Sequence, residues 1–403
     1  MNKPGLAGEG IPVAVVACPD YMPQNVSRAL RRALDLMGGL PAFVPPGSRV
    51  LVKPNLLQAV PPERAVCTHP VVTGEVVRSL TDEGCSVTVA DSPGGGTRYT
   101  ERNMERVYRV CGYAHLPEET GCSLNHDCRY REITVPGGSV CTRFPLMYPY
   151  FQADSIVSVS KAKTHVLTLM TGATKNLFGL LPGLEKPLFH SRFPDPAVFS
   201  DMLLDLLLAV RPALHIVDAI VAMEGDGPMS GSPRPLGAIV VSPSALAADI
   251  VLCRLMGIDP ARVPYLARAA ARGLVALDGS GIDLRGDPVS MLRGEDFRIP
   301  GTYASGKSGF SIPLVFRVVH RLGKVYQLRP VVDGSRCSGC GRCTVACPSN
   351  AAALVHGRAS IDPRKCIRCY CCHEMCEQGA IRLERGVVGA LIHAIAGEKR
   401  HEE

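Results

Sequence analysis

Two runs of cysteine near the C-terminus have the spacing of thiolate ligands for iron–sulfur clusters. The pattern C-x2-C-x2-C-x3-C occurs at Cys337, Cys340, Cys343 and Cys347, and again at Cys366, Cys369, Cys372 and Cys376. In such a run the first three thiolates bind one cubane cluster, and the fourth binds the neighbouring cluster. The first [4Fe-4S] cluster therefore takes Cys337, Cys340, Cys343 and Cys376, and the second takes Cys366, Cys369, Cys372 and Cys347. Clusters of this kind carry single electrons.

Zinc bound by four thiolates and free thiols are the alternatives to iron, and the doubled spacing favours iron. The extra Cys371 beside ligand Cys372 is interpreted as a bystander thiol. Pro348 follows the first run, whereas Glu377 follows the second. Over residues 331–385 the chain resembles the bacterial two-cluster ferredoxins, which implies a small C-terminal α+β domain with pseudo-twofold symmetry.

The eight cysteines outside this segment form no regular pattern. Cys18, Cys85 and Cys253 lie in apolar runs typical of a core. A third metal site, with His126 as a further ligand, is an alternative for the irregularly spaced Cys111, Cys122, Cys128 and Cys141. Cys67 lies beside Thr68 and His69, and we expect its thiol near a polar cleft.

That cleft is predicted from polar residues at the ends of four apolar runs. Lys53 and Asn55 end one run and Asp91 ends the next, and later runs end in Lys161, Lys163 and His165 and in Asp218 and Glu224. In an open parallel sheet, ligands bind outside the carboxyl ends of the strands. We therefore expect these side chains to share one cleft.

Residue types suggest how the cleft is used. His165, Glu224 and Lys163 are the candidate catalytic residues, because imidazole, carboxylate and amine groups hold or move protons. Lysines and backbone N–H groups bind anions, so binding of an anionic substrate or cofactor is assigned to Lys53, Asn55, Asp91, Gly94, Gly95, Lys161, Lys175, Asn176 and Asp218. A divalent metal on Asp218, Glu224 and His165 is an alternative, as is an organic cofactor. Ordinary turn, helix-cap and core roles are the structural alternatives.

Short β-branched runs alternate with helical patterns from residue 11 to about residue 280. Strands are expected at 13–18, 49–53, 86–90, 156–160, 214–220 and 238–241. Helices are expected at 26–37, 70–82, 100–110, 171–181, 198–210, 245–256 and 263–273. This alternation indicates an α/β fold with a mostly parallel sheet covered by helices on both faces. Residues 132–144 are expected to form an inserted hairpin.

Over about residues 12–260 the chain resembles the domain-of-unknown-function family 362. The resemblance rests on Val52–Leu56, Asp91–Gly95, Ser158–His165, Thr171–Gly179 and Asp218–Pro228. It implies a cytoplasmic iron–sulfur protein and brings no activity with it.

Composition sets the domain limits. Residues 1–300 are expected to form the α/β domain, residues 301–330 a linker with a basic amphipathic segment at Leu314–Tyr326, residues 331–385 the ferredoxin domain, and residues 386–403 a tail. The spacing at Gly225–Gly231 does not fit a dinucleotide motif.

The 403 residues include 17 cysteines, 20% charged residues and a net charge of +7. No secretion signal or membrane span is evident, so we expect a cytoplasmic protein. Aromatic residues make up only 5% of the chain, which disfavours nucleic-acid binding.

Two functions are compatible with these features. In the first, two [4Fe-4S] clusters pass single electrons to a cleft that binds an anionic small molecule, and a further protein donates or accepts the electrons. In the second, a non-enzymatic electron-transfer or maturation partner uses its large domain to bind another protein.

Overall fold

The computed structural model describes most of the chain. It covers residues 10–300 except 95, 96, 166, 184, 194, 226, 230, 293 and 295, together with 303, 329–345, 347, 349–366, 372, 376, 378 and 380–384. The predicted segment Leu314–Tyr326 and the predicted tail lie outside the described residues.

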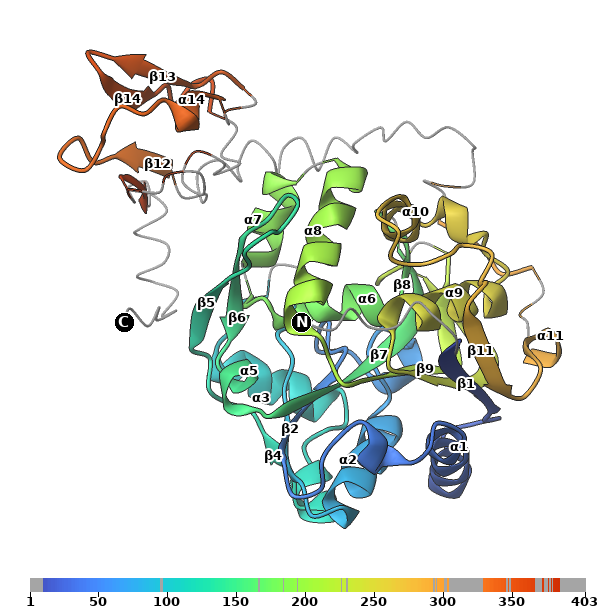
Figure 1. The fold of residues 1–403 in the computed structure, drawn as a ribbon. Coiled ribbons are helices and arrows are strands. Elements are labelled where there is room, and N and C mark those ends of the chain that lie inside the picture. Colours follow the sequence, from blue (N-terminus) through green and yellow to red (C-terminus); the bar gives the residue numbers. More distant parts are fainter. Residues whose placement is uncertain are drawn as a thin grey trace.

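The larger part of the chain is built on a nine-stranded, mostly parallel sheet (Figure 1). Its strands are β1 (Ile11–Ala17), β2 (Arg49–Pro54), β3 (Ser86–Val89), β4 (Ser123–Leu124), β7 (Ser155–His165), β8 (Leu169–Thr171), β9 (Leu214–Glu224), β10 (Ser232–Ser242) and β11 (Ile282–Gly286). They are ordered β11-β1-β10-β9-β7-β2-β3-β4, and β8 pairs with β7. In the described sheet, β10 and β8 are antiparallel to their neighbours.

Helices cover both faces of this sheet (Figure 1). They are α1 (Pro23–Leu36), α2 (Pro70–Asp82), α3 (Glu101–Val110), α4 (Leu116–Thr120), α5 (Pro149–Gln152), α6 (Ala173–Asn176), α7 (Glu185–Arg192), α8 (Pro196–Val210), α9 (Ala245–Leu255), α10 (Pro264–Ala271) and α11 (Val289–Leu292). Alternate residues of β1 pack into two separate cores, Ala14 and Val16 with α1 and Val13 and Val15 with α9. The predicted α/β class is therefore confirmed.

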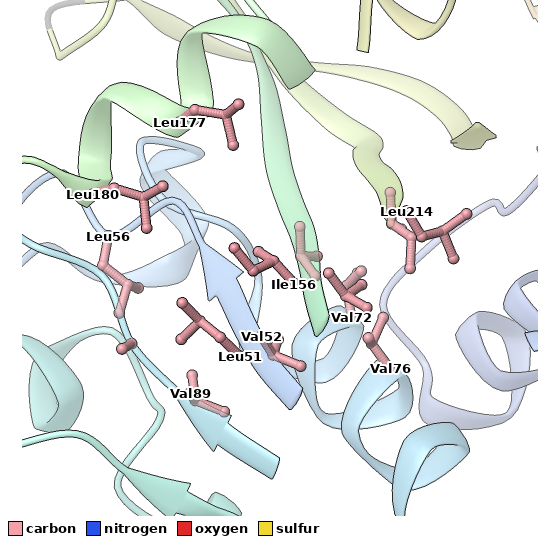
Figure 2. Close-up of a cluster of buried hydrophobic side chains, with 14 of the residues drawn as sticks. Leu51, Val52, Leu56, Val72, Val76, Val89, Ile156, Leu177, Leu180 and Leu214 are labelled. Carbon is pink, nitrogen blue, oxygen red and sulfur yellow. The ribbon is translucent and has the colours of Figure 1, made fainter. Parts of the chain in front are cut away.

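The core on the α2 side explains why the central strands are almost wholly apolar. Leu51 and Val52 of β2, Ile156 of β7, and Val72 and Val76 of α2 belong to one cluster of buried apolar side chains (Figure 2). All five side chains are at most 8% exposed. Strands buried on both faces require continuous apolar runs rather than alternation.

Several predicted elements match closely, while three strands are longer than expected. Helix α2 has its predicted limits, and the expected hairpin is formed by β5 (Tyr130–Thr134) and β6 (Arg143–Met147). Strands β7, β9 and β10 extend beyond their apolar runs. Strand β7 therefore includes Lys161, Lys163 and His165. These polar side chains can be buried in the strand because each has a hydrogen-bond partner.

The single helix expected at 171–181 is wrong. Strand β8 ends at Thr171, and α6 is followed by a 3-10 turn at Leu177–Leu180. Buried Asp249 accepts hydrogen bonds from the N–H groups of Ala173 at 2.6 Å and Thr174 at 3.0 Å. A Cβ at Gly172 would lie 2.0 Å from Asp249 Oδ1, so only glycine fits before α6.

The C-terminal part contains two antiparallel strand pairs. Strand β12 (Arg329–Val332) pairs with β15 (Ile381–Glu384), and β13 (Ala352–Val355) pairs with β14 (Arg358–Ile361). The short helix α14 (Arg342–Val345) follows the first cysteines. Strand β11 follows α10 within the α/β domain expected at residues 1–300, and it pairs with β1 at the edge of the large sheet.

Buried Asp205 stabilises the fold by linking α8 to the β5–β6 hairpin and to the end of α10. Its buried carboxylate accepts the N–H groups of Val140 at 2.8 Å and Cys141 at 3.1 Å, and it pairs with Arg272 at 3.2 Å. We expect Asp205→Ala to lower the free energy of unfolding by about 2–4 kcal/mol, because three donors lose their acceptor. Urea denaturation followed by circular dichroism measures this change.

Asp154→Ala is the matched control. Asp154 also pairs with an arginine, Arg49, but both side chains are exposed, so solvent screens the pair and little change is expected. An equal loss in both variants would contradict the role given to Asp205.

Candidate functional site

A polar cavity lies at the carboxyl ends of β2, β3 and β7. It encloses about 410 Å³, including the space open to solvent at its mouth. Seven of the predicted cleft residues line it, namely Asn55, Asp91, Gly94, Lys163, His165, Lys175 and Asn176. Ser92, Thr171, Phe178 and Lys186 also line it. Gly95 lies outside the described residues.

An ion pair between Lys53 and Asp91 lies directly behind this cavity. Lys53 Nζ is 2.7 Å from Asp91 Oδ1, and neither side chain is more than 2% exposed. Asp91 Oδ2 accepts the N–H of Leu56 at 2.6 Å. A Cβ at Gly179 would lie 2.2 Å from Asp91 Oδ1, so the turn after α6 packs directly on the pair.

Two further lysines are held by uncharged oxygen acceptors. Lys163 Nζ donates to Asn55 Oδ1 and to the carbonyl of Val66, both at 2.7 Å. Lys186 Nζ donates to the carbonyls of Ser92, Pro93 and Leu181 at 2.6–3.1 Å. These acceptors favour the ammonium form but do not neutralise its charge.

Lys175 differs from the other lysines. It is only partly buried, and its Nζ lies 5.5 Å from the centre of the Phe178 ring. Among the described residues, none accepts a hydrogen bond from this amine or pairs with it. Its head group is therefore available to a molecule in the cavity.

The cavity carries an excess of positive charge. Lys163, Lys175 and Lys186 line it, whereas the single lining carboxylate, Asp91, is already paired with Lys53. Burial lowers the pKa of Lys163 to about 8 and the pKa values of Lys175 and Lys186 to about 7. An anion in the cavity would stabilise the charged lysines.

Hydrogen bonds fix the ring of His165. Its Nδ1 accepts the backbone N–H groups of Leu167 at 3.0 Å and Thr168 at 3.4 Å, which assigns the ring proton to Nε2. Burial lowers the pKa of His165 well below 6.5, and the charge of Lys175 acts in the same direction. The side chain is therefore a neutral hydrogen-bond donor.

Three predicted residues lie apart from the cavity. Lys161 pairs with Asp218 at 2.8 Å, and Tyr21 donates to the same carboxylate at 2.9 Å. Glu224 accepts from the backbone N–H of Arg298 at 3.0 Å and from its Nε at 2.8 Å. The structure thus does not bring Asp218, Glu224 and His165 together as the ligands of one metal ion.

Three lining residues were not predicted in the cleft, namely Lys186, Thr171 and Phe178. For Lys186, a compositional signal was present. The chain has ten lysines among 44 basic residues, and the five between residues 4 and 306 are Lys53, Lys161, Lys163, Lys175 and Lys186. Most basic residues of this domain are arginines, and each of its five lysines is buried or lines the cavity.

A second cavity lies among the C-terminal cysteines. It encloses about 350 Å³, including space open to solvent, and its lining includes Cys337, Cys340, Cys343 and Cys376. These are the four residues predicted to bind the first cluster. They surround a space rather than meeting at a point, so thiolate chemistry and spacing both fit a cubane better than a single ion.

Backbone N–H groups point at the sulfur atoms of this region. Ala359 donates to Cys337 Sγ at 3.3 Å and Ala380 to Cys376 Sγ at 3.2 Å. Cys347 Sγ accepts from Ala351 at 3.1 Å and Ala352 at 3.4 Å. For the second predicted ligand set the structure describes Cys347, Cys366 and Cys372, whereas Cys369 and the extra Cys371 lie outside the described residues.

The scattered cysteines of the large domain do not form a third metal site in the described chain. Cys122 and Cys141 are buried, and Cys128 is partly exposed. Cys111 instead contacts Cys67, with 3.8 Å between their sulfur atoms.

Comparisons with known proteins match both parts of the chain. The family described as "Domain of unknown function (DUF362)" matches residues 50–254, and a 4Fe-4S dicluster domain matches residues 329–377. The second match identifies an iron–sulfur domain of the electron-transfer type.

Two curated relatives agree with this division. The chain is 32% identical over 269 residues to a thylakoid-associated protein of Synechocystis sp., a match that covers 65% of this chain and 79% of the relative. It is 49% identical over 38 residues to a ferredoxin-like protein in the nif region of Sinorhizobium fredii, covering 9% of this chain and 59% of that protein.

Among solved structures, the lactate racemase apoprotein from Thermoanaerobacterium thermosaccharolyticum is a distant match. It has a TM-score of 0.38 and 16% identity, and the match covers 64% of this chain and 59% of that one.

In the described residues, every helix is too short or too polar to span a membrane. From its matches over both parts, the chain belongs to the DUF362 family and carries a C-terminal 4Fe-4S dicluster domain.

Proposed function

We propose that the protein is an iron–sulfur redox protein whose large domain binds an anionic small molecule in the lysine-lined cavity. The observation that carries this proposal is the charge of that cavity, where three buried or partly buried lysines line the wall and the one lining carboxylate, Asp91, is already paired with Lys53. Buried cations without counter-charges are costly. A bound anion removes this cost.

We assign the first cluster to Cys337, Cys340, Cys343 and Cys376, and the second to Cys347, Cys366, Cys369 and Cys372. When bound, the clusters supply single-electron transfer. The N–H groups of Ala359 and Ala380 disperse negative charge on the cysteine sulfurs, which favours the reduced state. A second protein would donate or accept the electrons.

Within the cavity, Lys163 and Lys186 hold the anionic group as charged donors. His165 donates its Nε2–H to an oxygen of the bound molecule and does not act as a base, because both Nδ1 contacts require the proton on Nε2. Asn55 and Asn176 position Lys163 and Lys53. Glu224 takes no part, since Arg298 occupies its carboxylate.

The cluster assignment predicts the metal content. Protein purified without oxygen should contain about eight iron atoms and eight sulfide ions per chain. Cys376→Ser should lower iron to about half, because it removes one ligand of the first cluster. Iron and sulfide analysis with electron paramagnetic resonance of the reduced protein measures both.

Cys128→Ser is the control, because this partly exposed cysteine belongs to the large domain. It should leave the iron content unchanged. Protein containing zinc and no iron would contradict the assignment, as would equal iron loss in the two variants.

The cavity assignment predicts a pH-dependent affinity for anions. Sulfate is a suitable probe because its own charge is constant at neutral pH. Its affinity should fall by at least about tenfold between pH 6.5 and 9, as lysines with pKa values of about 7 to 8 lose their protons. Isothermal titration calorimetry should also detect proton uptake on binding near pH 7.5.

Lys163→Met should weaken sulfate binding by at least about tenfold, which is the usual effect of losing a charged hydrogen bond. Arg102→Met is the control, because it removes an exposed cation of α3. Affinity that does not depend on pH, or an equal loss in both variants, would exclude this cavity as the anion site.

A further inference from the structure

Lys175 is chemically distinct from the other lysines at the cavity. Lys53, Lys163 and Lys186 each donate to two or more protein oxygens, and these acceptors favour the ammonium form. Lys175 lines the cavity without such an acceptor among the described residues. It is therefore the lysine best suited to be a neutral amine.

The electrostatic surroundings act in the same direction. Burial lowers the pKa of Lys175 to about 7, and the charge of Lys163 contributes. A substantial fraction of the amine is then unprotonated near neutral pH. A desolvated lysine beside another cation is a common arrangement for a nucleophilic amine.

Two uncharged hydrogen-bonding groups face the same space without protein partners. No described residue accepts the Nε2–H of His165, and Thr171 Oγ1 is buried with no hydrogen-bond partner. Unpaired buried polar groups are rare. Both can contact an oxygen atom of a bound molecule, as a carbonyl group requires.

We propose that Lys175 forms an imine with a small carbonyl compound bearing an anionic group, held by Lys163 and Lys186. The inference rests on the proposed anion site and names the substrate class of that site. The unprotonated amine attacks the carbonyl carbon, a C–N bond forms, and the carbonyl oxygen leaves as water. His165 donates to that oxygen as negative charge develops on it.

Reductive trapping tests this step. The full-length, cluster-containing protein is incubated anaerobically at pH 7 with glyoxylate and sodium cyanoborohydride, and peptides are mapped by mass spectrometry. Hydride reduction of the imine leaves a carboxymethyl group on the reacting lysine. The chain has only ten lysines, so each can be followed separately.

We expect Lys175 to be labelled at least about tenfold faster than exposed Lys365, and sulfate should slow its labelling. Labelling with acetaldehyde, which lacks the anionic group, should show no preference for Lys175. Lys175→Arg keeps the positive charge but removes the nucleophilic amine, so it should bind sulfate and show no selective labelling. Sulfate binding also verifies that this variant is folded.

The outcomes separate the two proposals. Sulfate binding with glyoxylate labelling spread over exposed lysines would overturn the imine and leave the anion site intact. Selective labelling that persists at another cavity lysine in Lys175→Arg would overturn the choice of Lys175. Wild-type protein that neither binds sulfate nor is labelled selectively would overturn both proposals.

Discussion

Burial of lysine ammonium groups at the carboxyl edge of the sheet is the constraint on which the larger domain depends. A buried cation is tolerated only where acceptors reach it, and here the acceptors come from several segments. Asp91 follows β3, the carbonyl of Val66 precedes α2, and the carbonyl of Leu181 follows α6. Satisfying the lysines therefore joins segments that are far apart in the sequence.

Much of this arrangement can be predicted from the sequence because the strands end where their polar residues begin. The ends of β2, β3 and β7 predict one cleft, and Asn55, Asp91, Lys163 and His165 do line one cavity. The polar residues of β9, by contrast, do not reach this cavity. Asp218 and Glu224 depend on Tyr21 and Arg298, and the partner of a carboxylate cannot be read from its own strand.

The two parts of the chain differ in how far the local sequence determines their functional sites. The cysteine ligands are set by spacing within short loops, so the sequence alone identifies the C-terminal domain. The cavity is assembled from six separate stretches between Asn55 and Pro228. Lys186 follows no strand, which is why strand-end reasoning misses it. The helix expected from residue 171 begins only at Ala173, where buried Asp249, some 75 residues later, accepts the first N–H groups of α6.

The turn after β7 has a consequence for variation among related chains. His165 owes its orientation to the N–H groups of Leu167 and Thr168, only two and three residues further on. Inserting or deleting one residue there would move both donors away from Nδ1 and free the ring to change tautomer. Related chains that keep the histidine as a donor must therefore also keep the length of this turn, whatever side chains they place in it.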